Sequence, residues 1–344
     1  MIRTAEALVA PGKGILAADE STPTMAKRLA GIGLESTEQR RRAYRQILFT
    51  TERLGESISG VILFDETIRQ RADDGTAFPE LLHRQGIIPG IKVDGGTKPL
   101  AGCPDEVVTE GLDGLRDRLR EYASLGARFA KWRAVIHIGD SLPTTACIEA
   151  NAHALARYAA LAQEAGLTPI VEPEVLMAGK HRLERCEEVS AATLRAVYEQ
   201  LSRQGVVLEA SLLKPSMILP GADCPDAASD DEIAEATIRV LRQTVPAAVP
   251  GLVFLSGGQT DEQATARLDA LNRRGPQPWQ LSFSFGRALQ GPVLRAWVGD
   301  AGNVGIAQAA LLHRAELNAA ARGGSYHPEM ETFGLGRREP ATAT

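Results

Sequence analysis

The sequence is poor in residues that build disulfide frameworks and metal sites. It has four cysteines among 344 residues, far apart and without a Cys-x-x-Cys pair. Its six histidines show no His-Glu-x-x-His pattern or other spacing typical of zinc ligands. We therefore predict free thiols in a reducing cytoplasm, and neither a metal nor a cofactor. The cysteines are Cys103, Cys147, Cys186 and Cys224.

Long hydrophobic runs and a strong excess of one charge are also missing. No apolar stretch reaches the length of about 18 residues that a transmembrane helix needs. The first 14 residues lack an apolar core long enough for a signal peptide. A net charge of −5 provides no footprint for nucleic acid or for an anionic membrane. With 44% hydrophobic and 24% charged residues, we expect an ordinary globular protein of the cytoplasm without either partner.

Eight short apolar runs are present instead, and most of them end in charge. Each follows a turn signal such as Gly or Pro and precedes a longer segment with helical spacing. This alternation is typical of parallel strands covered on both faces. Eight such strands favour a single closed (β/α)8 TIM barrel over the alternative, an open doubly wound sheet. The runs are 14–19, 60–66, 88–94, 129–136, 169–175, 210–219, 252–258 and 281–287, and the clearest helical segments are 116–125, 148–164, 191–204, 231–244 and 261–272.

The domain boundaries follow from the same pattern. We expect one catalytic barrel domain over residues 1–327, with a short helical lead at 4–9. From residue 322 onward the sequence turns to Gly, Pro and small polar residues with little periodicity. Residues 328–344 are therefore predicted to form a flexible C-terminal tail.

Charged residues at the C-terminal ends of barrel strands converge on one mouth. Because side chains alternate along a strand, Lys131 and Arg133 should both face the interior, with Trp132 outside. Glu172 and Glu174 should share a face in the same way. A structural charge network is the alternative for any single pair, but burying so many charges without a function would cost too much. The converging residues are Asp19, Glu66, Lys92, Lys131, Arg133, Glu172, Glu174, Lys214, Ser256 and Arg287.

Lys214 lies in the middle of an apolar run, ASLLKPSMIL. Burial disfavours the charged amine, so a lysine there is either paired with a carboxylate or partly neutral. A neutral amine attacks carbonyl groups to form Schiff bases. Like-charge repulsion from Lys131 and Arg133 would keep part of Lys214 neutral. A structural lysine in a buried ion pair is the alternative.

Schiff-base chemistry also needs acids and bases. Glu172 is suited to donate the proton that dehydrates the carbinolamine, because one of two neighbouring carboxyls, Glu172 and Glu174, could stay protonated near neutral pH. Cleavage of a carbon–carbon bond needs a base that acts on a substrate hydroxyl, and Asp19 is the free candidate.

Two anion sites are predicted on opposite sides of the mouth. The first follows the last two strands, a place where barrels recurrently bind phosphate, and its small residues allow backbone N–H groups to approach an anion. It comprises Ser256, Gly257 and Gly258 together with Ser284, Gly286 and Arg287. The second comprises Ser21, Thr24 and Lys92. Two such sites flanking a Schiff-base lysine imply a bisphosphorylated sugar as the substrate.

The chain resembles the class I fructose-1,6-bisphosphate aldolase family from about residue 4 to residue 328. Several of the matching segments are long and chemically specific, and they occur in order. They are GKGILAADEST (12–22), VILFDET (61–67), PGIKVDGGTKPL (89–100), GARFAKWRAV (126–135), PIVEPE (169–174), LEASLLKPSM (208–217), FLSGGQ (254–259) and SFSFGRALQ (282–290).

The resemblance implies an activity and roles for single residues. The activity is the reversible retro-aldol cleavage of fructose 1,6-bisphosphate to dihydroxyacetone phosphate and glyceraldehyde 3-phosphate, in glycolysis and gluconeogenesis. The family's Schiff-base lysine matches Lys214, its acid–base glutamate Glu172, its second catalytic lysine Lys131, and the aspartate that acts in cleavage Asp19. Supporting and phosphate-binding positions match Arg133, Glu174, Lys92, Ser256, Gly257, Gly286, Arg287 and Ser21. The resemblance also implies a homo-oligomer, often a tetramer.

Two departures from the family pattern concern the site. Thr24 stands where animal members have a second phosphate-binding serine, and its hydroxyl can still serve. Animal members end in a tyrosine that assists proton exchange, whereas the last tyrosine here is Tyr326. Two alternatives stay open: a related Schiff-base aldolase preferring sedoheptulose 1,7-bisphosphate or fructose 1-phosphate, and a catalytically idle scaffold that binds sugar phosphates. An idle descendant would be expected to have lost Lys214 or Glu172.

Overall fold

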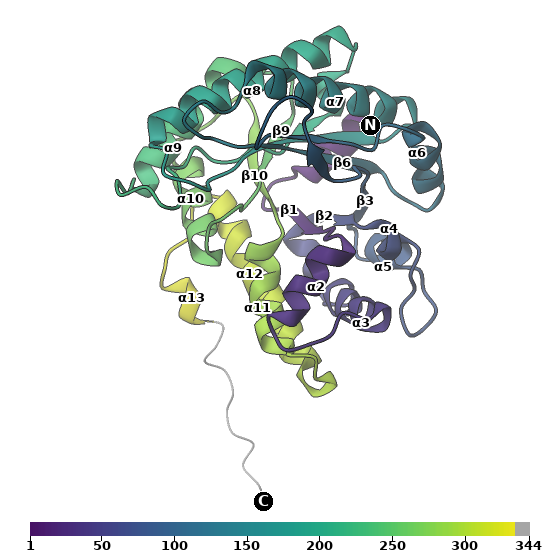
Figure 1. Cartoon of the computed structure of the whole chain (residues 1–344). Coiled ribbons are helices and arrows are strands. Elements are labelled where there is room, and N and C mark those ends of the chain that lie inside the picture. The colour runs from purple at the N-terminus through teal and green to yellow at the C-terminus, as the bar shows by residue number, and fades with distance from the viewer. Residues whose placement is uncertain (334–344) are drawn as a thin grey trace, which may run out of the picture.

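Eight parallel strands close into a barrel in the computed structural model, which describes residues 1–333. The order around the barrel is β1-β10-β9-β8-β7-β6-β3-β2. All eight predicted runs form these strands, and closure excludes the open doubly wound sheet. The first and last strands pair, so the purple N-terminal elements lie beside the yellow-green C-terminal ones (Figure 1). The strands are β1 (Gly14–Ala18), β2 (Ile58–Leu63), β3 (Ile88–Lys92), β6 (Phe129–Ile136), β7 (Thr168–Val175), β8 (Leu212–Leu213), β9 (Gly251–Phe254) and β10 (Gln280–Phe285).

Helices surround the strands, as Figure 1 shows. The five predicted helical segments are confirmed, and α8 begins eight residues earlier than expected because its first turns also bury Cys186 and Val189. Reciprocal capping boxes start α9 at Ser229 and α10 at Thr260. The helices are α1 (Ile2–Leu8), α2 (Thr22–Ala30), α3 (Glu38–Phe49), α4 (Asp65–Ile68), α5 (Phe78–Arg84), α6 (Leu115–Ser124), α7 (Thr145–Glu164), α8 (Leu183–Arg203), α9 (Asp230–Thr244), α10 (Asp261–Arg273), α11 (Arg287–Trp297), α12 (Val304–Arg322) and α13 (Met330–Phe333).

A small antiparallel hairpin follows β3 and was not predicted. It pairs β4 (Thr97–Pro99) with β5 (Val107–Thr109). Every residue of β4 is exposed, so the segment carries no apolar pattern from which a strand could be recognised. The hairpin matters because the loop that enters it borders the mouth of the barrel.

The barrel interior changes from apolar to charged along the strand axis. Near their N-terminal ends, β6 and β7 place Phe129 and Ile170 in the interior. Two residues further along each strand, Lys131 and Glu172 take the same face. Trp132 faces outward, as expected, and its ring stacks on Tyr158 of α7 at a centroid distance of 5.6 Å.

Helix α1 closes the apolar end of the barrel. Leu8 and Val9 join the interior core with Phe129. Two glycines permit this close approach: a Cβ on Gly60 would lie 2.5 Å from Leu8 Cδ2, and one on Gly251 would lie 2.7 Å from Val9 Cγ1. Because α1 closes the apolar end, the opposite, charged end of the barrel is the open mouth.

Part of the predicted tail is ordered. Tyr326 is buried and donates a hydrogen bond from its hydroxyl to Glu331 Oε1 over 2.8 Å. Arg314 of α12 pairs with the same carboxylate, so α13 is held against α12. The segment 328–344, predicted to be a flexible tail, therefore begins with a short helix, α13, that contacts α12. The remaining prediction, for 334–344, lies outside the described residues. Among residues 1–333, no helix combines the length and apolar character needed to cross a membrane.

Candidate active site

A cavity of about 910 Å³ opens at the C-terminal ends of the strands. Almost all predicted site residues line it, although they come from seven strand ends and two helices. Lining the cavity are Asp19, Ser21, Thr24, Lys92, Lys131, Arg133, Glu172, Glu174, Lys214, Ser256, Gly257, Ser284, Gly286 and Arg287. Gly258 and Glu66 are the two exceptions, and each is explained below.

Four side chains at the bottom of the cavity form a continuous row of alternating charge, here called the charge row. It runs Asp19, Lys131, Glu172, Lys214. Lys131 Nζ lies 2.6 Å from Asp19 Oδ2 and 3.1 Å from Glu172 Oε2. Lys214 Nζ lies 3.1 Å from the other oxygen of that glutamate, Oε1. At most 12% of any of these side chains is exposed, so the ion pairs lie out of water and interact strongly.

The charge row keeps both of its carboxylates ionised. Burial alone would raise the pKa of Asp19, but the charges of Lys131 and Lys214 lower it far below its usual range. Burial likewise opposes ionisation of Glu172, and the same two lysines with Arg133 lower its pKa. Of the two carboxyls, one of which was expected to stay protonated, Glu172 therefore does not fit that expectation, because three cations face it.

Lys131 is the protonated centre of the row. Burial would lower its pKa, but Asp19 and Glu172 together raise it well above the ordinary lysine value. The amine of Lys131 is consequently a fixed cation at neutral pH. Lys214, in contrast, has a single carboxylate contact in the row, with Glu172.

Glu174 is engaged by Arg133 rather than by Glu172. Arg133 Nε donates to Glu174 Oε2 over 2.5 Å. Burial would lower the pKa of the Arg133 guanidinium, but its contact with Glu174 raises it. About 39% of the Arg133 side chain is exposed, so this pair lies nearer the rim than the charge row.

Asp94 organises one side of the mouth and was not in the predicted set. Its carboxylate lies 2.6 Å from Lys92 Nζ. It also accepts backbone N–H bonds from Gly96 and Arg133, each over 3.2 Å. Asp94 therefore orients Lys92 and fixes the loop that leads into the hairpin. The alternation of strand side chains predicts that Asp94 shares the interior face with Lys92, but it does not indicate a role for Asp94.

The loop after β9 explains why Gly258 is absent from the cavity wall. A Cβ on Gly257 would lie 2.8 Å from Glu174 Oε1, so only glycine permits this close approach. Gly258 has φ +79°, and a Cβ there would lie 2.4 Å from Met177 Sδ. Gly258 thus turns the loop and packs on Met177 behind the cavity, and it leaves Ser256 and Gly257 facing inward.

The helices α2 and α11 both begin at the cavity. Ser21 precedes α2, and its Oγ lies 3.1 Å from Thr24 Oγ1. Lys27 and Arg28 line the cavity one turn further and were missed. Their spacing of three and four residues from Thr24 places them on the same helix face, which is the signal that could have identified them.

A buried network joins the two helices beneath the cavity. Glu20 accepts hydrogen bonds from Arg28 and Arg45, each over 2.5 Å, and from Gln290 Nε2 over 2.7 Å. Gln290 lies in α11 and also donates to Ala17 O at the end of β1 over 2.6 Å. Burial would raise the pKa of Glu20, but the two arginines lower it. The network ties the strand that leads to Asp19 to the helix that begins at Arg287.

Glu66 does not belong to this site. It lies in the first turn of α4. Its carboxylate accepts hydrogen bonds from Arg41 Nε over 2.8 Å and from Arg41 Nη2 over 2.5 Å. The strand β2 ends at Leu63, two residues separate it from Glu66, and the alternation of the strand no longer sets the direction of that side chain.

Comparison with known proteins matches the same family over nearly the whole chain. The family model described as fructose-bisphosphate aldolase class-I matches residues 1–338. The chain belongs to the class I fructose-bisphosphate aldolase family. A probable fructose-bisphosphate aldolase class 1 of Xanthomonas campestris pv. campestris is 58% identical over 327 residues, covering 95% of this chain and 98% of the relative.

Animal and parasite members of the aldolase family are also similar. Fructose-bisphosphate aldolase C of Rattus norvegicus is 52% identical, with 93% of this chain and 88% of the relative covered. The solved fructose-bisphosphate aldolase of Plasmodium falciparum, in a complex with TRAP and a small-molecule inhibitor, superposes with a TM-score of 0.94 at 48% identity. That match covers 95% of this chain and 94% of the other.

Within residues 1–333, no group of three or more His, Cys, Asp or Glu side chains is placed to hold a metal ion.

Replacing Lys131 by methionine tests the electrostatics of the charge row. We expect Lys131→Met to lower the free energy of unfolding by about 3–5 kcal/mol at pH 7, because two buried carboxylates lose their shared cation. In the unmodified aldolase, the pKa values of Asp19 and Glu172 are lowered, so their stabilisation is present at neutral pH and is lost as pH falls through those values. In the variant, burial is opposed by fewer cations, so both pKa values are higher than in the unmodified protein. The difference in free energy of unfolding between the unmodified protein and Lys131→Met should therefore narrow as pH falls from 7 towards about 4.

Denaturant unfolding at several pH values measures this difference. Lys98→Met is the matched control, since Lys98 is exposed on β4, and we expect it to change stability by less than about 0.5 kcal/mol. A difference for Lys131→Met that stays constant or grows on acidification would contradict the proposed balance of charges.

Proposed function

We propose that this chain is a class I fructose-bisphosphate aldolase that cleaves fructose 1,6-bisphosphate reversibly through a Schiff base on Lys214. The products are dihydroxyacetone phosphate and glyceraldehyde 3-phosphate. The observation that carries the proposal is the contact of Lys214 Nζ with Glu172 Oε1 at 3.1 Å inside the open mouth. An amine that forms a Schiff base must first lose a proton, and this carboxylate is within reach to accept it.

Proton transfer within the charge row accounts for the formation of the Schiff base. The Lys214 ammonium passes a proton to Glu172, and the neutral amine adds to the substrate ketone to give a carbinolamine. Glu172, now a carboxylic acid, returns the proton to the carbinolamine hydroxyl, and water leaves. One ammonium and one carbonyl thereby become one iminium and one water, so no outside proton is needed. Lys131 stays protonated throughout and stabilises Glu172 when it is again a carboxylate.

Carbon–carbon cleavage is assigned to Asp19. Its carboxylate takes the proton of the substrate hydroxyl next to the breaking bond, and the electron pair of that bond moves to the iminium to form an enamine. The aldehyde product then leaves. Asp19 is ionised at neutral pH and is held by Lys131 at 2.6 Å, so it is placed and charged to accept a proton.

Cationic side chains and backbone N–H groups in two parts of the mouth suit the two phosphates, although α2 and α11 follow the neighbouring strands β1 and β10 and so do not lie on opposite sides as expected. Ser256, Gly257, Ser284 and Gly286 with Arg287 form one proposed site, where α11 begins and its helix dipole favours an anion. The other proposed site is at the start of α2. Its residues are Ser21, Thr24, Lys27, Arg28 and, across the mouth, Lys92. Arg133 and Glu174 complete the proposed substrate-binding set.

Trapping the Schiff base tests this function. We expect dihydroxyacetone phosphate, added with EDTA present and reduced with borohydride, to leave a stable adduct on the peptide that contains Lys214. Mass spectrometry of the digested protein locates the adduct. Lys214→Met is the control: it removes the amine at similar side-chain length, and circular dichroism reports whether the barrel stays folded.

The presence or absence of the adduct distinguishes a Schiff-base aldolase from an idle scaffold that binds sugar phosphates. An adduct on Lys214 that is absent from a folded Lys214→Met variant supports covalent catalysis. If the intact protein is folded and acquires no adduct, the Schiff-base proposal is wrong, and the idle sugar-phosphate scaffold becomes the better account.

A homotetramer in the cytoplasm is part of the same proposal. Family resemblance supports the tetramer, and a similar plant relative, fructose-bisphosphate aldolase 4 of Arabidopsis thaliana, is described as cytosolic. We expect mass photometry of the purified protein to give a particle of four 36.8 kDa chains. A particle with the mass of one chain would contradict the tetramer.

A further inference from the structure

The strand that carries the proposed nucleophile is the shortest of the barrel. β8 comprises only Leu212 and Leu213, and they pair with Ile170 and Val171 of β7. Lys214 N still donates to Val171 O over 2.8 Å. The next residue is Pro215, which has no N–H to donate. The ladder to β7 therefore ends at Lys214, whereas on the other side Pro215 O still accepts a hydrogen bond from Leu255 N, just beyond β9, over 3.1 Å.

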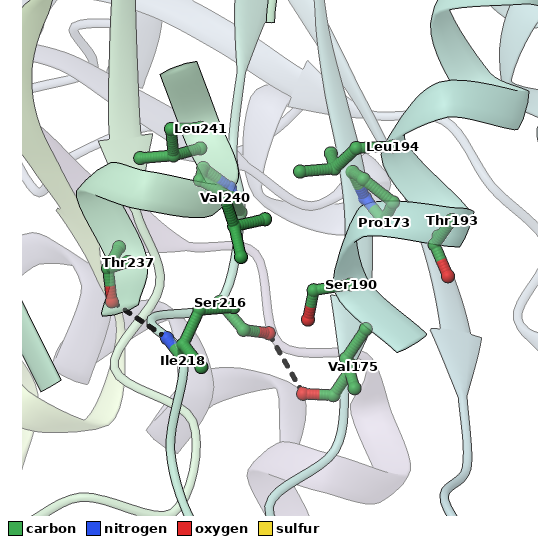
Figure 2. Close-up of a pocket in the computed structure, with 11 residues that line it drawn as sticks. Pro173, Val175, Ser190, Thr193, Leu194, Ser216, Ile218, Thr237, Val240 and Leu241 are labelled. Atoms are coloured by element: carbon green, nitrogen blue, oxygen red, sulfur yellow. Dashed lines mark hydrogen bonds between the residues drawn. The ribbon is translucent and has the colours of Figure 1, made fainter. Parts of the chain in front are cut away.

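Side chains hold the segment beyond Lys214 (Figure 2). Ser216 Oγ donates to Val175 O, the last residue of β7, over 2.9 Å. Further on, Ile218 N donates to Thr237 Oγ1 of α9 over 3.0 Å. The bond from Ser216 joins the same two elements that bring Lys214 and Glu172 together, because Glu172 lies three residues before Val175 in β7.

An apolar crevice lies behind this bond. Pro173 and Leu194 line it on the side of β7 and α8, and Val240 and Leu241 line it on the side of α9. Its volume is about 10 Å³, which is no more than a single water molecule needs. Apolar contacts on the outer side of the segment are non-directional, and the bond of Ser216 is the side-chain hydrogen bond that ties the segment to β7.

We propose that Ser216 is a positioning residue for the Schiff-base step: its hydroxyl replaces the missing ladder bond and keeps Lys214 Nζ within proton-transfer distance of Glu172. This inference rests on the proposed aldolase function. Ser216 itself lines the crevice behind the strands and not the cavity, so it acts through the position of Lys214. Without the bond, the end of β8 can shift relative to β7, which lengthens the contact that now measures 3.1 Å.

The test compares iminium formation with substrate binding. For Ser216→Ala, we expect the rate of borohydride-trappable adduct formation and kcat to fall by about tenfold, because a small misplacement of reacting groups is costly. KM for fructose 1,6-bisphosphate should stay within about twofold, because the proposed phosphate-binding residues lie on other elements. Ser216→Thr, which keeps the hydroxyl, should restore the trapping rate to within about twofold of the original.

Ser211→Ala is the matched control. Ser211 lies three residues before Lys214, is buried, and donates to Leu208 O over 2.8 Å within its own turn. We expect it to leave the trapping rate unchanged, and thermal unfolding of both variants measures any loss of stability. The positioning role would be overturned if Ser216→Ala forms the borohydride-trappable adduct at the original rate. It would also be overturned if Ser211→Ala slows adduct formation as much as Ser216→Ala does. Absence of any adduct in the unmodified protein would instead refute the aldolase function itself.

Discussion

A buried lysine between two carboxylates is the interaction on which the rest of this site depends. Lys131 contacts Asp19 and Glu172 at 2.6 and 3.1 Å, and through Glu172 it is linked to Lys214. Removing charges from water is expensive, so such a row persists only if every member has a partner of opposite sign. The alternation of sign meets that requirement. Lys131 contacts two carboxylates and Lys214 only one, and the proposed proton transfer from Lys214 to Glu172 rests on this difference.

The barrel supplies the geometry that makes the charge row possible. Lys131 and Glu172 each lie two residues beyond an apolar interior residue of the same strand, Phe129 in β6 and Ile170 in β7, and α1 closes the apolar end. The segment around Lys214 is the exception to regular strand structure, because its ladder with β7 ends at Lys214. Its position depends on side-chain bonds in addition to the strand itself.

The strands and the inward-facing charges could be predicted because both depend on local patterns. A short apolar run predicts a covered strand, and the period of two places Lys131, Arg133, Glu172 and Glu174 on the inner face. Protonation states could not be predicted in this way. Glu172 is adjacent to Glu174 in the sequence pattern, but in space three cations face it and lower its pKa. Interactions between distant segments set that balance, and no local pattern records them.

The same limit explains the other differences. Gln290 joins β1 to α11 across more than 250 residues of sequence, and Gly258 faces Met177 from a different loop. Neither contact is indicated by the residues next to it in the sequence. Glu66 was misplaced because the end of the run 60–66 was taken as the end of a strand, whereas β2 ends at Leu63 and Glu66 lies in α4. Lys27 and Arg28, in contrast, follow Thr24 at helical spacing and were within the reach of sequence analysis.

Glu172→Gln tests most directly whether proton transfer within the charge row drives catalysis. Glutamine keeps the shape of the side chain but cannot shuttle a proton between Lys214 and the carbinolamine. The account predicts that the rate of borohydride-trappable adduct formation with dihydroxyacetone phosphate falls by about 100-fold or more, while binding of that ligand changes by only a few-fold. A folded Glu172→Gln variant that forms the adduct as fast as the unmodified protein would contradict the account.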